Sequence, residues 1–326
     1  MSGFNEQGQL GIGNTISQKV PVPVQFDSKV ISISCGFEYS SAVTEKGEVY
    51  VWGEFERQKN LKQVLPDKKT KSLVPIKINF TKAAKVYSFY HGLGIITSNL
   101  KIYIDSLIKP EEIDGSPLQS IVSIQKSGKM TGILSTDGKL YMRGRHTGDD
   151  QDILEEFEYQ SLPELIKQIS FGDTHYSALS FGGNVYMWGS DEFGRSGFEG
   201  QVVDDDLPPA RKLKFSLPIS QIEMGDVTSA ALTEDGMLYM WGANIYGMIL
   251  NETYVPDWFK PKLLPTGYPN SKYITLPTPI DVGAPVSGLA LGGGYVIAVT
   301  NDGIVNYWGN PKYGPGGSFL IGIIQD

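Results

Sequence analysis

Apolar and polar residues alternate over short stretches of this chain, and turn residues separate the stretches. In "NVYMWG" at 184–189, Val185 and Met187 alternate with aromatic residues, directly after a glycine pair. A period of two residues flanked by turn signals indicates short β-strands in hairpins. No segment has a convincing period of 3.6 residues, and only residues 152–160 are compatible with a helical turn or, alternatively, a loop. The pattern therefore predicts an all-β protein.

One short motif recurs along the chain. The stretches "VYVWG", "VYMWG", "LYMWG" and "VNYWG" share a final Trp-Gly pair, and a further copy, "LYMRG", has arginine in the tryptophan place. A second glycine lies 17 residues before each of the four Trp-Gly endings. We predict that the repeat is carried by Gly36, Trp52, Gly53, Gly172, His175, Trp188, Gly189, Gly225, Trp241, Gly242, Gly292, Trp308 and Gly309.

The spacing of the final glycines divides the chain into six units of 39 to 67 residues. The second unit is a worn copy at 88–105, with serine and aspartate in the two glycine places. Units of this length suit the four short strands of one propeller blade. We expect three antiparallel strands in each of 30–53, 166–189, 219–242 and 286–309.

The repeated residues have a packing role in this interpretation. Glycine permits a close approach of backbone where strands converge, and tryptophan beside it buries a large surface between neighbouring blades. Trp188 and Trp241 are expected to lie in the core between blades. Trp52 and Trp308 flank the expected closure of the ring, so we expect them to matter less.

These motifs resemble the repeat of the regulator of chromosome condensation family. The segment "GFNEQGQLGIG" at 3–13 is similar to the end of that repeat, and "FGDTHYSAL" at 171–179 is similar to its glycine–histidine column. The resemblance implies a β-propeller, seven-bladed in that family, and a structural, hydrogen-bonded role for His175. Only six units are visible, and Ser2-Gly3 occupy the Trp-Gly place with no strand before them. Six or seven blades therefore both stay open.

We expect residues 1–326 to form a single propeller domain interrupted by long insertions. The insertions are predicted at about 54–75, 145–165 and 245–284, where the repeat landmarks are absent. The last belongs to the longest interval, and it combines many prolines with aromatic residues outside the repeat motif.

Composition removes several classes of function. The chain has 28 Lys+Arg against 36 Asp+Glu, a formal charge of −8, which argues against a specific nucleic-acid partner. One cysteine and three histidines leave little for a disulfide framework or a metal site, and no apolar stretch is long enough to span a membrane. Phosphate-binding, zinc and serine-nucleophile motifs are absent. We therefore predict no enzyme, no cofactor and no metal.

The third insertion is the predicted partner contact. Aromatic residues on a proline-stiffened loop lose little entropy when they dock on a partner, whereas the other interpretation is that they pack on the propeller rim. The candidate partner-binding residues are Tyr254, Asp257, Trp258, Phe259, Lys260, Tyr268 and Tyr273.

Two hypotheses of function remain at the level of sequence. The first is a non-catalytic scaffold for protein–protein interaction, monomeric and intracellular, in the cytoplasm or, if an N-terminal segment is missing, in mitochondria or the nucleus. The second, which the family resemblance implies, is guanine-nucleotide exchange on a small Ran- or Ras-like GTPase. Fold alone does not decide between them.

Overall fold

The computed structural model describes residues 1–309, with gaps at 146–152, 200–208, 245–247 and 250–272 and shorter ones between 19 and 129 and at 293. The chain forms two compact units, and the boundary between them falls between residues 124 and 125. Each unit is described by itself. The described elements are strands, apart from short 3₁₀ turns. The expectation of an all-β chain is therefore confirmed.

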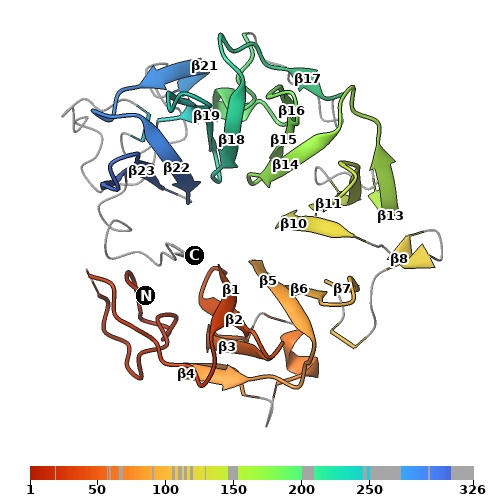
Figure 1. Ribbon diagram of the computed structural model, residues 1–326, viewed down its shortest axis with the longest axis vertical. Helices are drawn as coiled ribbons and strands as arrows, with labels where there is room; N and C mark the ends of the chain where they lie inside the picture. Colours follow the sequence, from red (N-terminus) through yellow and green to blue (C-terminus); the bar gives the residue numbers. More distant parts are fainter. Residues whose placement is uncertain are drawn as a thin grey trace. The chain divides into compact units, whose positions relative to one another are not determined.

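Unit 1 contains two antiparallel sheets in which strands follow one another in chain order (Figure 1). A short 3₁₀ helix, η1, lies between the third and fourth strands, and a small hairpin follows the second sheet. The first sheet is β1 (Val30–Cys35), β2 (Tyr39–Thr44), β3 (Val49–Glu54) and β4 (Lys71–Lys77); the second is β5 (Ala83–Phe89), β6 (Gly92–Thr97) and β7 (Ile102–Tyr103); η1 is Leu61–Gln63, and the hairpin is β8 (Glu112–Ile113) with β9 (Ser116–Pro117).

Unit 2 repeats the same meander four times, and its first strand begins in the last residues of unit 1. Its sheets are β10 (Ile121–Ser127), β11 (Met130–Ser135), β12 (Leu140–Arg145) and β13 (Ile153–Gln160); β14 (Ile166–Phe171), β15 (His175–Ser180), β16 (Val185–Gly189) and β17 (Arg211–Lys212); β18 (Ile219–Met224), β19 (Thr228–Thr233), β20 (Leu238–Ala243) and β21 (Tyr273–Ile280); and β22 (Val286–Leu291), β23 (Tyr295–Thr300) and β24 (Val305–Gly309). Each of the four segments expected to hold three strands does so.

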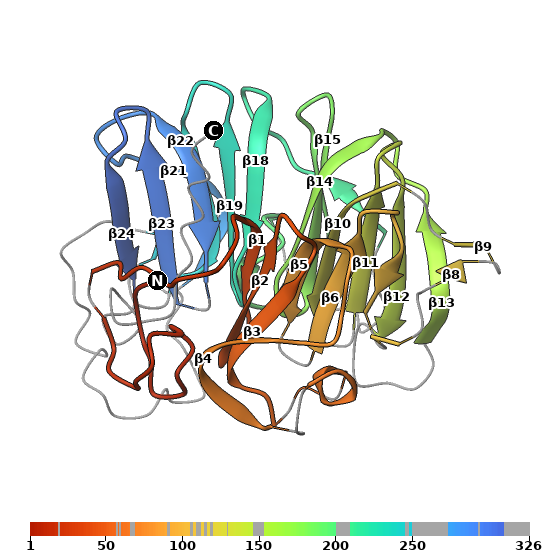
Figure 2. The same cartoon turned by 60° about the horizontal axis from the view of Figure 1, so that its bottom comes forward.

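The meander gives every sheet two different ends. At one end, which we call the turn end, the first strand begins and a hairpin joins the second strand to the third. Figure 2 shows these hairpins of unit 2 along its upper edge. The first and third strands finish at the other end, which we call the loop end. Long connections, including most of the predicted insertions, leave from the loop end, so the two ends offer different surfaces.

Polar side chains link several first strands to the next one within a unit. Gln168 on β14 donates its amide to Ile222 O at 2.7 Å and accepts from Ile222 N at 3.1 Å. Gln221 on β18 makes the same pair of bonds with Leu289 on β22, at 2.7 and 3.2 Å. These first strands are antiparallel only to their own second strands, so their remaining backbone groups are satisfied by side chains of the neighbouring sheet.

The Trp-Gly pairs of the repeat lie at the ends of the third strands. Trp52, Trp188 and Trp241 are buried, as expected for residues between sheets, whereas Trp308 is only partly buried. Trp52 is as deeply buried as Trp241, so the expectation that it matters less is not supported by its packing. Gly242 has a φ of +99°, and a Cβ there would lie 2.6 Å from Val227 O, directly before the paired strand β19. Only glycine satisfies both conditions.

The predicted insertions contain outer strands, which corrects their expected boundaries. Residues 71–77 form β4, residues 153–160 form β13 and residues 273–280 form β21, each paired with the third strand of its sheet. Residues 153–160 are thus a strand, and the expectation of a helical turn or a loop at 152–160 is wrong for them. An outer strand has one free edge and one neighbouring strand, so its sequence carries little alternation by which it could be recognised.

Candidate partner-binding site

The third predicted insertion leaves unit 2 at the loop end, beside the connection that follows Gly189. This connection contains η3 (Glu192–Gly194), which packs against β20 and β21 of the next sheet. Residues 190–197 therefore lie at the root of the insertion, where the chain departs after β20 and returns at β21. We take this root as the candidate site, because its residues are described and the predicted partner loop begins and ends there.

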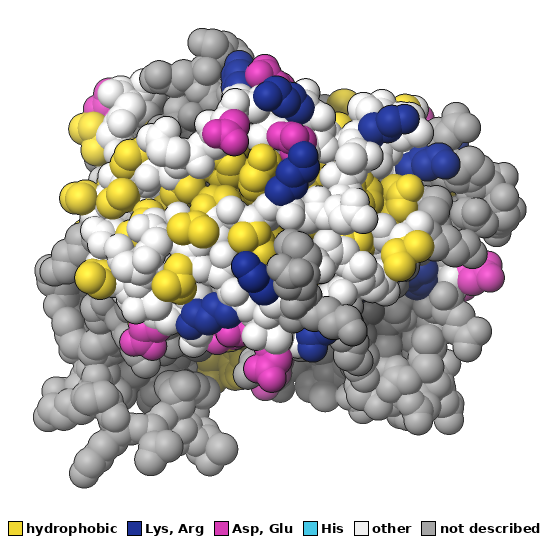
Figure 3. Space-filling view, turned by 90° about the horizontal axis from the view of Figure 1, so that it is seen from below, with side chains coloured by type: hydrophobic (Ala, Val, Ile, Leu, Met, Phe, Trp, Pro, Cys, Tyr) yellow, Lys and Arg dark blue, Asp and Glu magenta, His cyan; other side chains and the backbone are white. Residues whose placement is uncertain are grey.

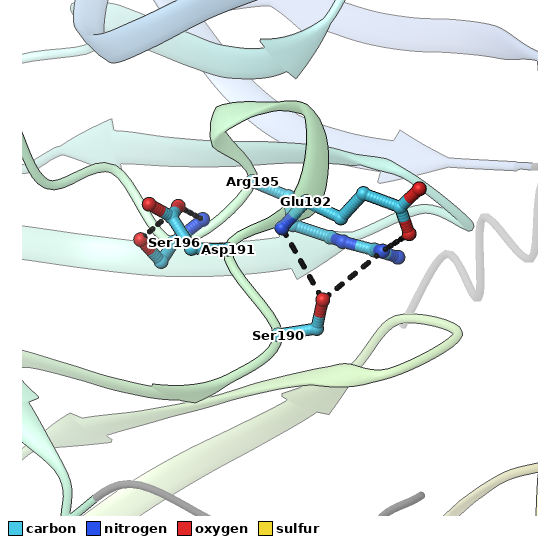
Figure 4. Close-up of polar contacts among 5 residues, drawn as sticks. All are labelled: Ser190, Asp191, Glu192, Arg195 and Ser196. Atoms are coloured by element: carbon cyan, nitrogen blue, oxygen red, sulfur yellow. Dashed lines mark hydrogen bonds and ion pairs between the residues drawn. The ribbon is translucent and has the colours of Figure 1, made fainter. Parts of the chain in front are cut away.

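Arg195 is buried and stabilises the connection through its side chain and its carbonyl oxygen. Its side chain is 3% exposed and forms an ion pair with Glu192 at 2.9 Å, while Ser190 Oγ accepts a second bond at 3.2 Å (Figure 4). Its carbonyl oxygen accepts from Ser229 Oγ at 2.8 Å and from Trp241 Nε1 at 3.0 Å. Because the Glu192 side chain is 64% exposed, the buried guanidinium holds a carboxylate at the surface.

Asp191 closes the same connection into a fixed turn. Its carboxylate accepts from Ser196 N at 3.1 Å and from the Ser196 hydroxyl (Figure 4). Asn5 accepts from Leu10 N at 2.8 Å in the equivalent turn of unit 1. The spacing of five residues is the same in both turns. The Asn or Asp at this position of the repeat therefore stabilises the turn by accepting a hydrogen bond from its backbone.

Phe193 is the strained residue of the site. It has a φ of +66°, a left-handed conformation that is uncommon for a residue other than glycine. Its ring lies 5.3 Å from the ring of Tyr273, and the Arg195 guanidinium lies 5.5 Å from its centroid. Backbone strain that the surroundings hold in place is frequent at binding sites, which makes Phe193 a functional candidate.

Tyr273 is the predicted partner-binding residue that the structure describes. It is the first residue of β21, pairs with Ala243 and is partly buried, so it belongs to a strand and not to an extended loop. The other predicted partner-binding residues lie outside the described residues; they are Tyr254, Asp257, Trp258, Phe259, Lys260 and Tyr268.

His175 is buried against the glycine that precedes it in the repeat. The ring packs on Gly172, where a Cβ would overlap it, which explains the glycine–histidine pair. Neither ring nitrogen has a hydrogen-bond partner within the described part of the protein, so the expected hydrogen-bonded role is not seen. Burial, and next the charge of Arg195, lowers the pKa of His175 to about 3. The imidazole is therefore neutral at physiological pH and suits packing.

Two acidic loops meet at the same end of unit 2. Asp173 N donates to Asp226 O at 3.1 Å, so the loops after β14 and β18 lie side by side. Burial, and next the charge of Asp173, raises the pKa of Asp226. Glu223, on β18, accepts from Gln221 at 3.1 Å, and burial raises its pKa to about 7. The sequence did not point to these carboxylates, because Asp173 lies in a different repeat from Glu223 and Asp226.

The described residues contain no group of three or more His, Cys, Asp or Glu side chains placed to hold a metal ion. Within the same residues, no helix has the length and apolar character needed to cross a membrane.

Comparison with protein families identifies the repeat. A model of the regulator of chromosome condensation (RCC1) repeat matches residues 2–43, and a second RCC1 repeat model matches residues 166–195 and 219–247. This chain contains RCC1 repeats. The matched segments include the quoted "GFNEQGQLGIG" and "FGDTHYSAL" motifs, so the resemblance found from the sequence is confirmed.

Several curated proteins are similar to this chain over most of its length. It is 28% identical over 89% of its length to Protein RCC1 of Candida albicans, and 26% identical over 98% to the mitochondrial RCC1 domain-containing protein RUG3 of Arabidopsis thaliana. It is 22% identical over 94% to the guanine nucleotide exchange factor SRM1 of Saccharomyces cerevisiae. The matches cover 57%, 62% and 59% of those proteins, so the chain spans about three fifths of their length.

Solved structures establish the fold. Human WBSCR16 superimposes with a TM-score of 0.77 at 17% identity, covering 97% of this chain and 90% of that one. Prp20p from Saccharomyces cerevisiae gives a TM-score of 0.76 at 19% identity, covering 97% and 81%. The chain is thus an all-β propeller of the RCC1 type, and its six predicted units correspond to the six described sheets of three or four strands. The predicted fold class is confirmed.

Proposed function

We propose that this chain is a non-catalytic binding module for a protein partner. The partner contact is the loop end of unit 2, with the insertion that is rooted there. The observation that carries this proposal is Phe193, held in a left-handed conformation against Tyr273 at the return of the insertion. A buried guanidinium fixes Glu192 at the same surface, so an aromatic ring and a carboxylate are presented together.

A replacement of residues 250–272 by a Gly-Ser linker tests this function. The linker must leave β21 intact, because that strand completes the sheet of β18–β20. We expect an unchanged melting temperature, since the cost of closing a loop changes slowly with its length, and loss of the partner recovered by the intact chain in affinity purification.

Phe193→Ala provides a second variant that leaves the insertion in place. A fold that collapses in the linker variant would make the insertion part of the core. Partner recovery that is unchanged in both variants would contradict the proposed site. A control is Val74→Ala, an exposed apolar residue on β4 of unit 1 that lies in neither proposed surface.

Nucleotide exchange on a small GTPase is the second candidate. The name of SRM1 favours it, and so does Prp20p, whose crystal structure is described together with its binding to Gsp1p and histones. The adjacent loops of Asp173 and Asp226 also favour it, because exchange requires acidic or polar groups that displace magnesium and nucleotide. We nevertheless expect no acceleration of nucleotide release from a Ran-type GTPase. A clear acceleration that Asp173→Ala abolishes would replace the binding-module proposal by this one.

We also infer that the chain is monomeric and intracellular. A single cysteine, partly buried on β1, suits a reducing compartment, because disulfides within the chain are impossible. Sedimentation equilibrium and localisation of a tagged chain test the two points separately. Relatives with mitochondrial and RCC1 names keep mitochondria and the nucleus as alternatives to the cytoplasm.

A further inference from the structure

The turn end of unit 2 carries a row of exposed apolar side chains. Each belongs either to a hairpin between the second and third strands or to the five residues before a first strand. They are 44–65% exposed, although isoleucine, leucine, methionine and phenylalanine are usually buried. The row consists of Leu165, Phe181, Leu217, Met237 and Ile304.

Backbone contacts place the members of this row next to one another. Phe181 N donates to Leu165 O at 3.0 Å. The same hairpin bonds the next sheet, because Ile219 N donates to Gly183 O at 2.9 Å, two residues beyond Leu217. The pattern continues from Glu234 N to Pro218 O at 3.2 Å and from Asn301 N to Pro285 O at 2.9 Å. Because Val286 N also donates to Gly236 O at 2.9 Å, backbone bonds join the turn ends of three neighbouring sheets. The row therefore gathers its exposed apolar residues along these joined ends instead of scattering them over the surface.

Acidic residues surround this row. In the four hairpins of unit 2 and the five residues before β14, β18 and β22, six carboxylates stand against two lysines. One of the lysines, Lys139, is already paired with Asp137 at 2.7 Å. The six carboxylates are Asp137, Glu164, Glu234, Asp235, Asp281 and Asp302.

Four of these carboxylates are held in place by neighbouring donors. Hydroxyl groups at the ends of second strands bond Asp137, Asp235 and Asp302, and Glu164 accepts from Ser180, Asn184 and Tyr186 at 2.6–2.9 Å. Hydrogen bonds from Lys139, Thr300 and Tyr186 lower the pKa of the carboxyl groups that accept them. The negative charge is therefore fixed and present at neutral pH, which reduces the entropy lost when a cation docks.

Unit 1 shows that this surface is not a general property of the repeat. The equivalent hairpins and lead-in segments of unit 1 contain Asp27, Glu45 and Glu48 against four lysines, at positions 29, 46, 82 and 101. Among these residues only Leu100 is an exposed large apolar side chain. Figure 3 shows another face, on which basic and acidic side chains lie together among apolar ones.

We propose that the turn end of unit 2 binds a basic amphipathic segment of a protein partner. Apolar side chains of that segment lie along the row from Leu165 to Ile304, and its lysines or arginines face the surrounding carboxylates. Both halves of the recognition follow from complementarity, since apolar area supplies affinity and the fixed charges select a cationic partner. The surface lies at the opposite end of each sheet from the proposed loop-end site, so the module can hold two partners.

The charge decides between classes of partner. An anionic membrane surface also accepts exposed apolar side chains, but it attracts cationic faces and is repelled by this one. The same repulsion applies to the phosphates of a nucleic acid. A basic protein segment is the class that both the apolar row and the carboxylates fit.

The test uses a fluorescent synthetic helix of lysine and leucine as the probe and the full chain as the receptor. Fluorescence anisotropy measures its affinity, and we expect Phe181→Ser with Leu217→Ser to weaken binding about tenfold or more. Asp235→Asn with Asp302→Asn should weaken it and reduce its dependence on salt. A photo-crosslinking residue at position 181 should capture the probe, whereas the same residue at position 74, exposed on β4, should not.

The controls separate this surface from unspecific attraction to an acidic protein. Leu100→Asn changes an exposed hairpin residue of unit 1 and should leave binding unchanged, and circular dichroism should give the same melting temperature for all variants. The proposal is overturned if a glutamate–leucine helix binds equally well, if the variants at 181 and 217 bind like the intact chain, or if phosphatidylserine vesicles capture the chain through residue 181. Loss of the loop-end partner in the linker variant does not affect any of these outcomes.

Discussion

At the scale of single residues, glycines and tryptophans of the repeat have roles that the contacts make specific. Trp241 is fully buried and donates its indole N–H to Arg195 O, the carbonyl that also binds Ser229. Trp308 makes the corresponding bond to Met248 O at 2.7 Å but stays partly exposed. We therefore expect the same motif to contribute differently to the stability of different sheets.

Trp241→Ala should lower the free energy of unfolding by about 3–5 kcal/mol, the range for a large buried aromatic. Trp308→Ala should cost less, because part of its surface already faces solvent. Urea denaturation followed by circular dichroism measures both. Equal losses for the two variants would contradict the packing argument.

Gly242→Ala should destabilise the chain by about 2–5 kcal/mol, since strain at a positive φ adds to a clash with the paired backbone. Gly303→Ala is the matched control. It has a φ of +83° but nothing within 4 Å of the added carbon, so only the conformational cost of about 1 kcal/mol applies. Chemical denaturation of both variants checks the difference, and similar losses would show that the close approach is unimportant.

Glu223 makes stability depend on pH. Its folded-state pKa, about 7, lies above the ordinary value of 4.5 because the carboxyl is buried. The folded state therefore binds the proton more tightly, and the free energy of unfolding falls as pH rises from about 4.5 to about 7. Glu223→Gln should flatten this fall and be the more stable chain at pH 8, as measured by urea denaturation across pH. A pH profile identical to that of the intact chain would contradict the assignment.

At the scale of elements, the second sheet shows how a worn repeat keeps its place. Ile104 stands where other units have tryptophan, and a side chain from the β3–β4 connection of the first sheet bonds this part of the second sheet instead. Asn60, beside η1, donates to Leu93 O at 2.8 Å and to Ile104 O, and accepts from Leu93 N at 3.1 Å. In the third unit, Arg143 takes the tryptophan place and its guanidinium lies 4.2 Å from the centroid of Phe157 on β13. Different side chains thus hold equivalent strands.

Asn60→Ala should cost about 2–4 kcal/mol, because it leaves buried backbone groups of β6 without partners. Asn60→Asp should be no better, since it loses both donor bonds and places a charge near carbonyl oxygens. Lys62→Ala, an exposed change on η1 itself, is the control. Thermal and urea unfolding compare the three, and a stable aspartate variant would contradict the role given to the amide donors.

At the scale of the whole molecule, charge limits the class of partner. The net charge of −8 repels phosphate, and the turn end of unit 2 adds a fixed acidic surface. We expect no retardation of duplex DNA in a gel at about 0.15 M salt, where a cationic protein would bind. Retardation that weakens steeply with added salt would contradict this expectation.

Local patterns along the chain were sufficient to predict the all-β fold, the number of repeat units and the residues that mark them. Alternation and hairpin turns are local, so first, second and third strands could be recognised from a few adjacent residues. Glycine and tryptophan also report their own constraints, a positive φ or a large buried surface. Conformation and composition within one repeat were therefore enough for this part of the fold.

The course of the outer strands and the meeting of distant side chains depend on packing in three dimensions. The strands β4, β13 and β21 have one paired edge, and their place depends on the third strand they join rather than on their own pattern. Tyr273 is a strand residue because β21 pairs with β20. The pairing of the loops of Asp173 and Asp226, and the row from Leu165 to Ile304, join residues from different repeats. Such neighbours are set by the packing of one sheet against the next, which no local pattern encodes.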